Sequence, residues 1–199
     1  TLVQLDDHDY GAGNIWGAER GGETSGVGFP MAPCLVNIAQ DMALGHLPDP
    51  ANPNLELDTG ITVHYSKFAY GAVDFAVLEA RKFKSFNLDG TILGSAQETW
   101  LENSFCSDNS RVKVVLGQTP FAQVNTMFYR NSEIGPSTGG TAPKDSNGFP
   151  VPGRKRVMEI LQDCGSRPVV ALSGDTHLSV AVTYHDYGVS ECSSPAAIN

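Results

Sequence analysis

Acidic and histidine residues are concentrated in one short segment near the start of the chain, Asp6, Asp7, His8 and Asp9. This segment follows the apolar run 2–5, which predicts a strand that ends at these side chains. Near the other end of the chain, a second apolar run, 168–172, leads into residues 173–177, which again include Asp and His. Carboxylate oxygens bind hard cations, and imidazole suits transition metals. The two segments therefore indicate a metal-centred hydrolytic site.

Both clusters are expected just beyond the carboxyl ends of strands, which is where functional groups gather in open α/β sheets. Carboxylates packed at one strand end repel one another unless a cation or several hydrogen-bond donors compensate them. A bound metal can hold and polarise a phosphoryl group and can generate hydroxide near neutral pH. The Gly-Asp-x-His pattern taken alone is as typical of an ordinary loop, so the prediction depends on the two segments lying together.

Strand and helix patterns alternate between the two clusters. Pro33 favours the first turn of a helix. The apolar face of that helix would comprise Leu35, Ile38, Ala39 and Met42. Ser95 and Glu98 have the spacing of a capping box for a second helix, and residues 157–164 have the periodicity of a third. The segments with strand composition are 61–68, 73–79, 112–116, 169–172 and 179–184, the first two as a hairpin. This order predicts the α/β class with a mixed sheet.

The composition is that of an ordinary soluble globular protein, with 41% hydrophobic and 18% charged residues. A net charge of −9 argues against nucleic acid or an anionic membrane as partner, because both reward clustered Lys and Arg. It does not exclude an anionic substrate, since bound cations can outweigh the protein's own charge locally. The sequence contains no run of about 18 apolar residues that would predict a transmembrane helix. It contains no signal-peptide pattern either.

The glycine-rich segment 11–28 and the Ser-, Gly-, Thr- and Pro-rich segment 132–148 are expected to be loops. The cysteines are Cys34, Cys106, Cys164 and Cys192. None forms a CxxC pair, which argues against a structural zinc site. Two disulfides in an exported protein are compatible with the even count. Buried free thiols at Cys34 and Cys164 fit equally well, because both fall on apolar helix faces.

Several short motifs follow one another in an order that resembles a known family. The first and last, 6–9 with 13–17 and 172–178, are specific as a pair; the supporting ones are 77–85, 93–101, 114–119 and 147–150. Together they resemble the PhoD-like alkaline phosphatase/phosphodiesterase family, within the calcineurin-like metallophosphoesterase superfamily. The resemblance implies a layered α/β/β/α sandwich with mixed sheets, of which residues 1–199 would form a partial catalytic domain.

The resemblance implies roles for four residues of the two terminal motifs. Asp7 matches a ligand of the second metal. His8 matches the histidine that contacts the phosphoryl group and protonates the leaving oxygen as general acid. Asp175 and His177 match an Asp/His pair that binds the second and the first metal, respectively.

Four further residues are assigned to supporting positions. The resemblance places Asn14 and Arg81 at polar positions close to the substrate pocket. Arg81 could pair bidentately with phosphate oxygens or form an ion pair with a nearby carboxylate, and the sequence leaves both alternatives open. Asp6 and Asp9 are expected to support the site rather than bind metal, by fixing His8 and balancing the metal charge. His46 and His64 are expected to be structural.

The chain departs from the family pattern at its start. Members carry further metal ligands upstream of the Asp-Asp-His motif, including an Asp that bridges the two metals and a Cys and a Tyr that bind iron. Cys34 and Tyr10 come after that motif and do not match them. Because Thr1 already lies inside the expected first strand, we expect an internal or C-terminal fragment that holds about half of a two-metal site. Missing targeting signals then say nothing about localisation.

The expected parent protein is a metal-dependent phosphoric ester hydrolase that uses a metal-bound hydroxide on small phosphomonoesters or phosphodiesters. The resemblance implies iron and calcium as the two metal ions, and an exported location. The isolated fragment is expected to be inactive. The alternatives are a non-catalytic calcium-binding or carbohydrate-binding module and a metallohydrolase of non-phosphate esters. Convergence of Asp7, His8, Asp175 and His177 would favour the two-metal interpretation.

Overall fold

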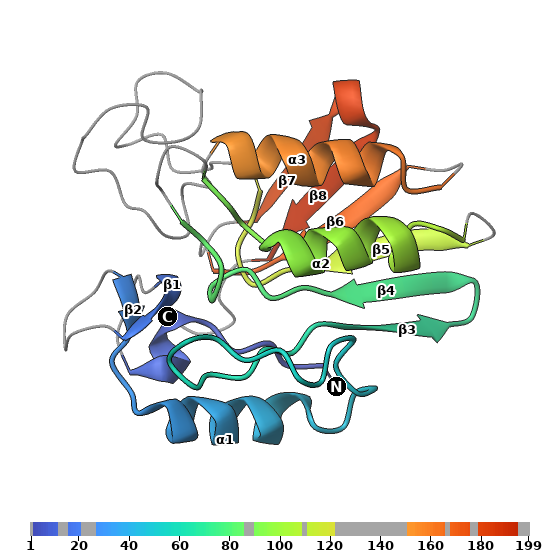
Figure 1. Ribbon diagram of the computed structural model, residues 1–199. Helices are drawn as coiled ribbons and strands as arrows, with labels where there is room; N and C mark the ends of the chain where they lie inside the picture. Colours follow the sequence, from blue (N-terminus) through green and yellow to red (C-terminus); the bar gives the residue numbers. More distant parts are fainter. Residues whose placement is uncertain are drawn as a thin grey trace.

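The computed structural model describes most of the chain. The described ranges are 2–11, 16–20, 27–85, 90–108, 111–121, 151–165, 168–175 and 179–194. Within them a six-stranded mixed sheet carries helices on one face (Figure 1). The α/β class with a mixed sheet is therefore confirmed. Of the α/β/β/α sandwich that the resemblance implies, these residues provide one large sheet and its helical layer.

The large sheet has the strand order β3-β4-β5-β6-β8-β7. Its strands are β3 (Ser66–Tyr70), β4 (Val73–Val77), β5 (Val112–Leu116), β6 (Val169–Ser173), β7 (Val180–Tyr184) and β8 (Val189–Ser193). The four inner strands run parallel, and β3 and β7 pair antiparallel at the two edges. The carboxyl ends of β4, β5 and β6 consequently lie next to one another, which brings the segments after these strands together.

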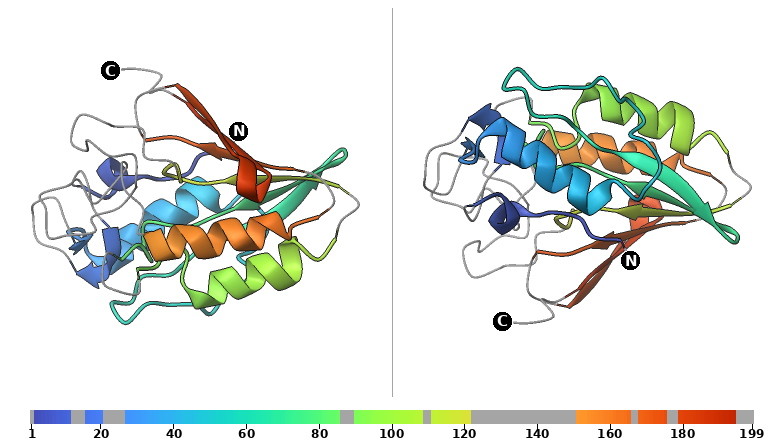
Figure 2. Two further views of the ribbon diagram at one scale, coloured as in Figure 1. Left: turned by 90° about the horizontal axis from the view of Figure 1, so that it is seen from above. Right: turned by 90° about the horizontal axis from the view of Figure 1, so that it is seen from below.

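Helices α2 (Ser95–Trp100) and α3 (Val151–Gln162) lie on the same face of the sheet (Figures 1 and 2). A π-helical turn, η2 (Leu101–Phe105), continues α2. The main core joins both layers and includes Ala76, Val115, Ala171 and Val189 from the sheet and Leu101, Phe105, Val157 and Leu161 from the helices. Valine and alanine on the strands leave room for the larger side chains of the helices, so the two layers pack closely. None of the helices within the described ranges has the length and apolar character needed to cross a bilayer.

The first helix, α1 (Pro33–Leu44), begins at Pro33 as expected but buries a different face. Three of the four residues of the expected apolar face are exposed, by 47% at Leu35, 54% at Ile38 and 82% at Met42, and only Ala39 of that set packs against a core. Val36 packs instead into a small second core, and Gln40 is buried because its amide donates to Thr62 Oγ1 at 3.0 Å. The prediction of the buried face was wrong because apolar spacing does not reveal that Gln40, with its hydrogen bond to Thr62, lies on the buried side of the helix.

Several other boundaries differ from the expectations. Residues 2–6 are extended but form no strand, and the expected strand 61–68 is a strand only from Ser66. The expected glycine-rich loop 11–28 contains two short strands, β1 (Trp16–Arg20) and β2 (Val27–Phe29), which pair parallel. Strand β8 was not predicted. Its neighbour β7 begins at Val180, close to the expected position.

The predicted capping box at Ser95 is wrong. Gly94 is the N-cap residue, with a φ of 72°, and a Cβ atom there would lie 2.7 Å from the ring of Phe83. Ser95 is the first helical residue, and Glu98 forms an ion pair with Arg156 Nε at 3.5 Å, on α3. The glutamate thus links the two helices of one layer.

A disulfide between Cys106 and Cys164 joins the end of η2 to the residues after α3. It decides between the alternatives left open for Cys164, which is fully buried. Cys34 and Cys192 are exposed thiols, so Cys34 is not the buried residue that its helical position suggested.

Replacing Cys106 and Cys164 by Ser should lower the free energy of unfolding by about 4 kcal/mol, because the bridge spans 58 positions and restricts the unfolded chain. Urea unfolding followed by circular dichroism would measure the change. Replacing the exposed Cys34 and Cys192 by Ser is the matched control and should leave stability unchanged. Equal stability of the two double variants would contradict the prediction.

Acid should weaken the fold through His64. Burial lowers the pKa of His64 below 6.5, and the nearby Lys82 ammonium lowers it further. The native state then binds fewer protons than the unfolded state between the two pKa values, so stability falls as pH decreases from 6.5. Urea unfolding at pH 7.5 and at pH 5 should show a smaller loss for His64→Gln than for the unsubstituted chain. The exposed His46→Gln is the control, and an identical loss in all three proteins would refute the role of His64.

Candidate active site

The N-terminal segment is held across the ends of the central strands by two glutamine side chains. Gln4 Nε2 donates to the carbonyl oxygen of Leu78, directly after β4, at 2.9 Å and to that of Leu116, the last residue of β5, at 3.3 Å. Gln118 Nε2 donates to the carbonyl oxygen of Leu5 at 2.9 Å. These side-chain hydrogen bonds replace the strand pairing expected for residues 2–5 and fix the position of the acidic motif that follows.

The acidic motif forms a short 3₁₀ helix, η1 (Asp7–Tyr10), which starts after Asp6. The carboxylate of Asp9 accepts a hydrogen bond from the backbone N–H of Asp6 at 2.8 Å, and Asp6 caps the helix in return. Tyr10 is buried edge-to-face against Phe29, with ring centroids 4.9 Å apart. Burial, with smaller contributions from negative charges that include Glu79, raises the pKa of Tyr10, so its hydroxyl stays neutral. The motif is thus capped at one end and anchored in the core at the other.

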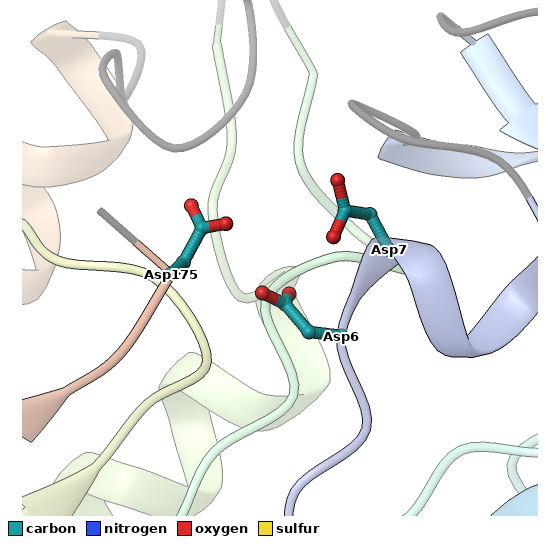
Figure 3. A group of neighbouring side chains, drawn as sticks. All are labelled: Asp6, Asp7 and Asp175. Carbon is teal, nitrogen blue, oxygen red and sulfur yellow. The ribbon is translucent and has the colours of Figure 1, made fainter. Parts of the chain in front are cut away.

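Three carboxylates from distant parts of the chain meet beyond the carboxyl ends of the central strands. One oxygen each from Asp6, Asp7 and Asp175 lies within 4.8 Å of the other two. Figure 3 shows Asp6 and Asp7 on the N-terminal segment and Asp175 just after β6, with the side chains pointing toward one another. Asp7 is 5% exposed. The convergence expected for Asp7 and Asp175 is therefore present, and Asp6 joins it.

Arg81 is fully buried beside this carboxylate group. Its Nε forms an ion pair with Asp6, and one terminal nitrogen lies 3.2 Å from Asp175 Oδ1 and 3.7 Å from Asp7 Oδ1. Of the two alternatives for Arg81, the ion pair with nearby carboxylates is present in the structure. A contact between Arg81 and phosphate remains a prediction.

The three carboxylates fit a hard cation. They offer closely spaced oxygen ligands, which Ca²⁺, Mg²⁺ and similar ions prefer. With the Arg81 guanidinium, the four side chains carry a formal charge of −3 + 1 = −2. Excess negative charge in a partly buried group is costly, and a divalent cation would balance it. This donor set does not distinguish among hard cations.

The remaining predicted residues are less closely gathered. His8 is exposed on η1, outside the carboxylate group, and its backbone N–H donates to Asp7 Oδ1 at 2.8 Å. Asp9 is exposed, and its carboxylate bonds to the Asp6 backbone. Asn14 and His177 lie outside the described residues, so their convergence stays a prediction.

A cavity of about 300 Å³ opens beside the carboxylates. Asp6 and Asp175 line it together with Gln4, Gln118, Ser173 and neighbouring residues of the strand ends. The cavity gives a small ligand access to the carboxylate group from the side of the sheet ends.

Further polar residues that sequence reasoning missed support this arrangement. Gln118 is 7% exposed, and its Oε1 accepts from the backbone N–H groups of Ala80, at 2.9 Å, and Arg81, at 3.3 Å. The buried pair Glu79–Lys82 has an Nζ–Oε2 distance of 3.6 Å. Burial lowers the pKa of Lys82, and the charge of Glu79 opposes that effect.

A positional signal could have found two of the missed residues. Glu79, Gln118 and Asp175 each lie two positions after the last residue of β4, β5 and β6, respectively. Because these strands are adjacent and parallel, the same position after each strand falls in one region of the fold. Comparing the strand ends would therefore have grouped Glu79 and Gln118 with Asp175.

Comparison with known proteins places the chain in a family. The family described as PhoD-like phosphatase matches residues 2–198. The chain belongs to the PhoD-like phosphatase family. The resemblance inferred from the motifs is therefore confirmed.

Two relatives in this family are much longer than the chain. Alkaline phosphatase D of Bacillus subtilis (strain 168) is 29% identical over 153 residues, which are 68% of this chain and 24% of that protein. A solved structure described as "Structure of PhoD" superposes with a TM-score of 0.64 at 23% identity and covers 98% of this chain and 39% of its own. The chain thus has the fold of part of the PhoD structure and spans about a quarter of the Bacillus protein.

Arg81→Gln should lower the free energy of unfolding of the metal-free chain by about 3–5 kcal/mol, because it leaves buried carboxylates without their cation. Millimolar Ca²⁺ should restore part of the loss, since the ion would replace the missing charge. Urea unfolding with and without Ca²⁺ would measure both effects.

Arg111→Gln is the matched control for this measurement. Arg111 is 39% exposed and pairs with Asp74 at 3.6 Å, so its loss should cost less than about 1 kcal/mol and should not respond to Ca²⁺. Equal losses in the two variants would contradict a special role for Arg81.

Proposed function

We propose that the chain is part of a metal-dependent phosphoric ester hydrolase, with Asp7 and Asp175 among its metal ligands. The observation that carries the proposal is the meeting of carboxylates from both ends of the chain within 4.8 Å. Membership of the PhoD-like phosphatase family supports the reaction class. The cavity beside the carboxylates is suited to a small phosphate ester.

Each residue of the group has a distinct part in this proposal. Asp7, Asp175 and His177 would hold two metal ions, for which the resemblance suggests iron and calcium, and Asp6 would support them. Bound ions would orient the phosphoryl group, neutralise its equatorial oxygens and make hydroxide available near neutral pH. Arg81 keeps the carboxylates together through its ion pairs with Asp6 and Asp175.

His8 is proposed as the general acid. Its exposure on η1 leaves the imidazole accessible to a bound ester, while its backbone bond to Asp7 ties it to the metal ligands. From this position it would protonate the leaving oxygen as the ester bond breaks. Asn14 is proposed to bind the phosphate from the segment after η1.

The Cys106–Cys164 disulfide supports an exported location. Disulfides form and persist in oxidising compartments and are rare in reducing ones. We therefore propose a periplasmic or extracellular site of action.

The second candidate is a non-catalytic calcium-binding module. An all-oxygen group of carboxylates among the described residues is the observation that favours it, because calcium takes oxygen ligands. Hydrolysis of p-nitrophenyl phosphate or bis(p-nitrophenyl) phosphate, abolished by a chelator, would support the hydrolase. Ca²⁺ binding by the full-length protein without turnover would support the module, and turnover of p-nitrophenyl acetate alone would indicate a non-phosphate esterase.

In the full-length protein, His8→Ala should keep its metals but lose about 10²–10⁴-fold in kcat, the usual contribution of a general acid. Asp175→Asn should instead weaken metal binding, because an amide is a poorer ligand than a carboxylate. Metal content by mass spectrometry and kcat on p-nitrophenyl phosphate would separate the two effects. The exposed Asp49→Asn is the control for Asp175→Asn. Undiminished turnover of His8→Ala would refute the general-acid role.

A further inference from the structure

Glu191 is a buried carboxylate that lies outside the group described above. It is on β8, is 2% exposed, and pairs in register with Ala171 of β6 and Val182 of β7. Its Oε1 accepts hydrogen bonds from the backbone N–H of Phe121, at 2.8 Å, and from Ser173 Oγ, at 3.1 Å. Its Oε2 accepts one from the Tyr184 hydroxyl at 2.8 Å.

Placing a carboxylate among apolar strand residues is costly unless its hydrogen bonds are satisfied. An apolar residue would fill this inward position without that cost, as Val189 does two residues earlier on the same strand. The donors around Glu191 offset the cost, because hydrogen bonds to a charged group are stronger than neutral ones. The carboxylate therefore serves as a junction for the three segments that supply its donors.

Two of these segments lead to the carboxylate group. Ser173 ends β6 and lies two residues before Asp175. Phe121 lies in the segment after β5, three residues beyond Gln118, which holds Leu5 and the Arg81 backbone. The two segments also contact each other, since the N–H of Gly174 donates to the Gln118 carbonyl at 3.2 Å.

Asp175 needs this support because of its backbone conformation. Its φ is +69°, and among the described residues no other non-glycine residue has a positive φ. Aspartate adopts this left-handed conformation more readily than most residues with a Cβ atom, but it is still uncommon, and neighbours that fix it stabilise it. The anchored Ser173 lies at the strand end that leads directly into this residue.

We propose that Glu191 is a positioning residue. Through Oε1 it fixes the segments after β5 and β6 so that the Asp175 carboxylate stays directed at Asp6 and Asp7. The metal-binding consequence rests on the proposed function; the fixing of the two segments does not.

A substitution at Tyr184 can distinguish a positioning role of Glu191 from a purely structural one. It bonds to the other oxygen of the same carboxylate, from an edge strand, and burial and the Glu191 charge raise its pKa so that it remains a donor. Tyr184→Phe therefore removes one bond to Glu191 while leaving Oε1 and both segments in place. Glu191→Gln keeps an acceptor at Oε1, whereas Glu191→Leu removes it and Ser173→Ala removes one donor to it.

The test is a calorimetric titration of each variant, made in the full-length protein, with Mn²⁺ alone. Glu191→Leu should raise the Kd about 10–100-fold, the usual effect of losing a residue that orients a ligand. Ser173→Ala should raise it in the same direction by a smaller factor. Glu191→Gln and Tyr184→Phe should stay within about threefold of the unsubstituted chain, although Tyr184→Phe should lower the Tm. If Glu191→Leu does not fold, an unchanged Kd in Ser173→Ala overturns the proposal.

Amide hydrogen exchange gives a second measurement that does not depend on metal. Peptides covering 117–121 and 173–175 should exchange faster in Glu191→Leu and Ser173→Ala than in Tyr184→Phe. Equal exchange in all variants would overturn the positioning role. Absence of Mn²⁺ binding by the unsubstituted full-length protein would instead overturn the proposed function, and the exchange rates would then decide the positioning role alone.

Discussion

The structure depends on how it accommodates carboxylates from distant parts of the chain in a space a few ångströms wide. Asp6, Asp7 and Asp175 would repel one another if the surrounding groups did not compensate their charge. Arg81, buried beside them, supplies one positive charge from the segment after β4. The compensation is incomplete, since the four side chains sum to −2, and it is this remainder that makes a cation-binding role physically reasonable.

Strand topology determines where these groups meet. The adjacent parallel strands β4, β5 and β6 each end two residues before a polar side chain: Glu79, Gln118 and Asp175. The extended segment 2–6 then crosses these ends, and Gln4 attaches it to the carbonyl groups of Leu78 and Leu116. The same bonds satisfy buried backbone groups and position the acidic motif, so one set of interactions serves both stability and the site.

Much of this arrangement could be predicted from the sequence, because the strongest signals are local. The helix start at Pro33 and the valine-rich strands β5 and β6 follow from short patterns. The features that were missed depend on distant partners. Leu35 and Met42 have helical apolar spacing, yet α1 buries Gln40 because Thr62 accepts its hydrogen bond.

The same explanation covers β8, the disulfide and the first strand. β8 carries Ser190, Glu191 and Ser193, and these polar residues remove the apolar pattern that would have predicted a strand. The Glu191 carboxylate can be buried there because Phe121 and Ser173, from other segments, donate hydrogen bonds to it. The pairing of Cys106 with Cys164 depends on how η2 and α3 pack, which periodicity does not reveal. Residues 2–5 have the composition of a strand, but they attach to the sheet through the side chains of Gln4 and Gln118 and not through backbone pairing. The acidic motifs and Arg81 were predicted from the sequence, whereas the glutamines that hold the N-terminal segment were missed.

The side chains that hold the N-terminal acidic segment differ in charge from the carboxylates of Asp6, Asp7 and Asp175, and this difference has a physical consequence. Gln4 and Gln118 are neutral, and Gln118 both donates to Leu5 and accepts from the Arg81 backbone. The buried Glu79–Lys82 pair is neutral as a whole. Neutral amides and balanced pairs hold the segments together without adding to the repulsion among the carboxylates. The negative charge is therefore concentrated at the point where the strand ends meet, and a cation that binds there changes the local charge while the hydrogen bonds that set the geometry remain in place.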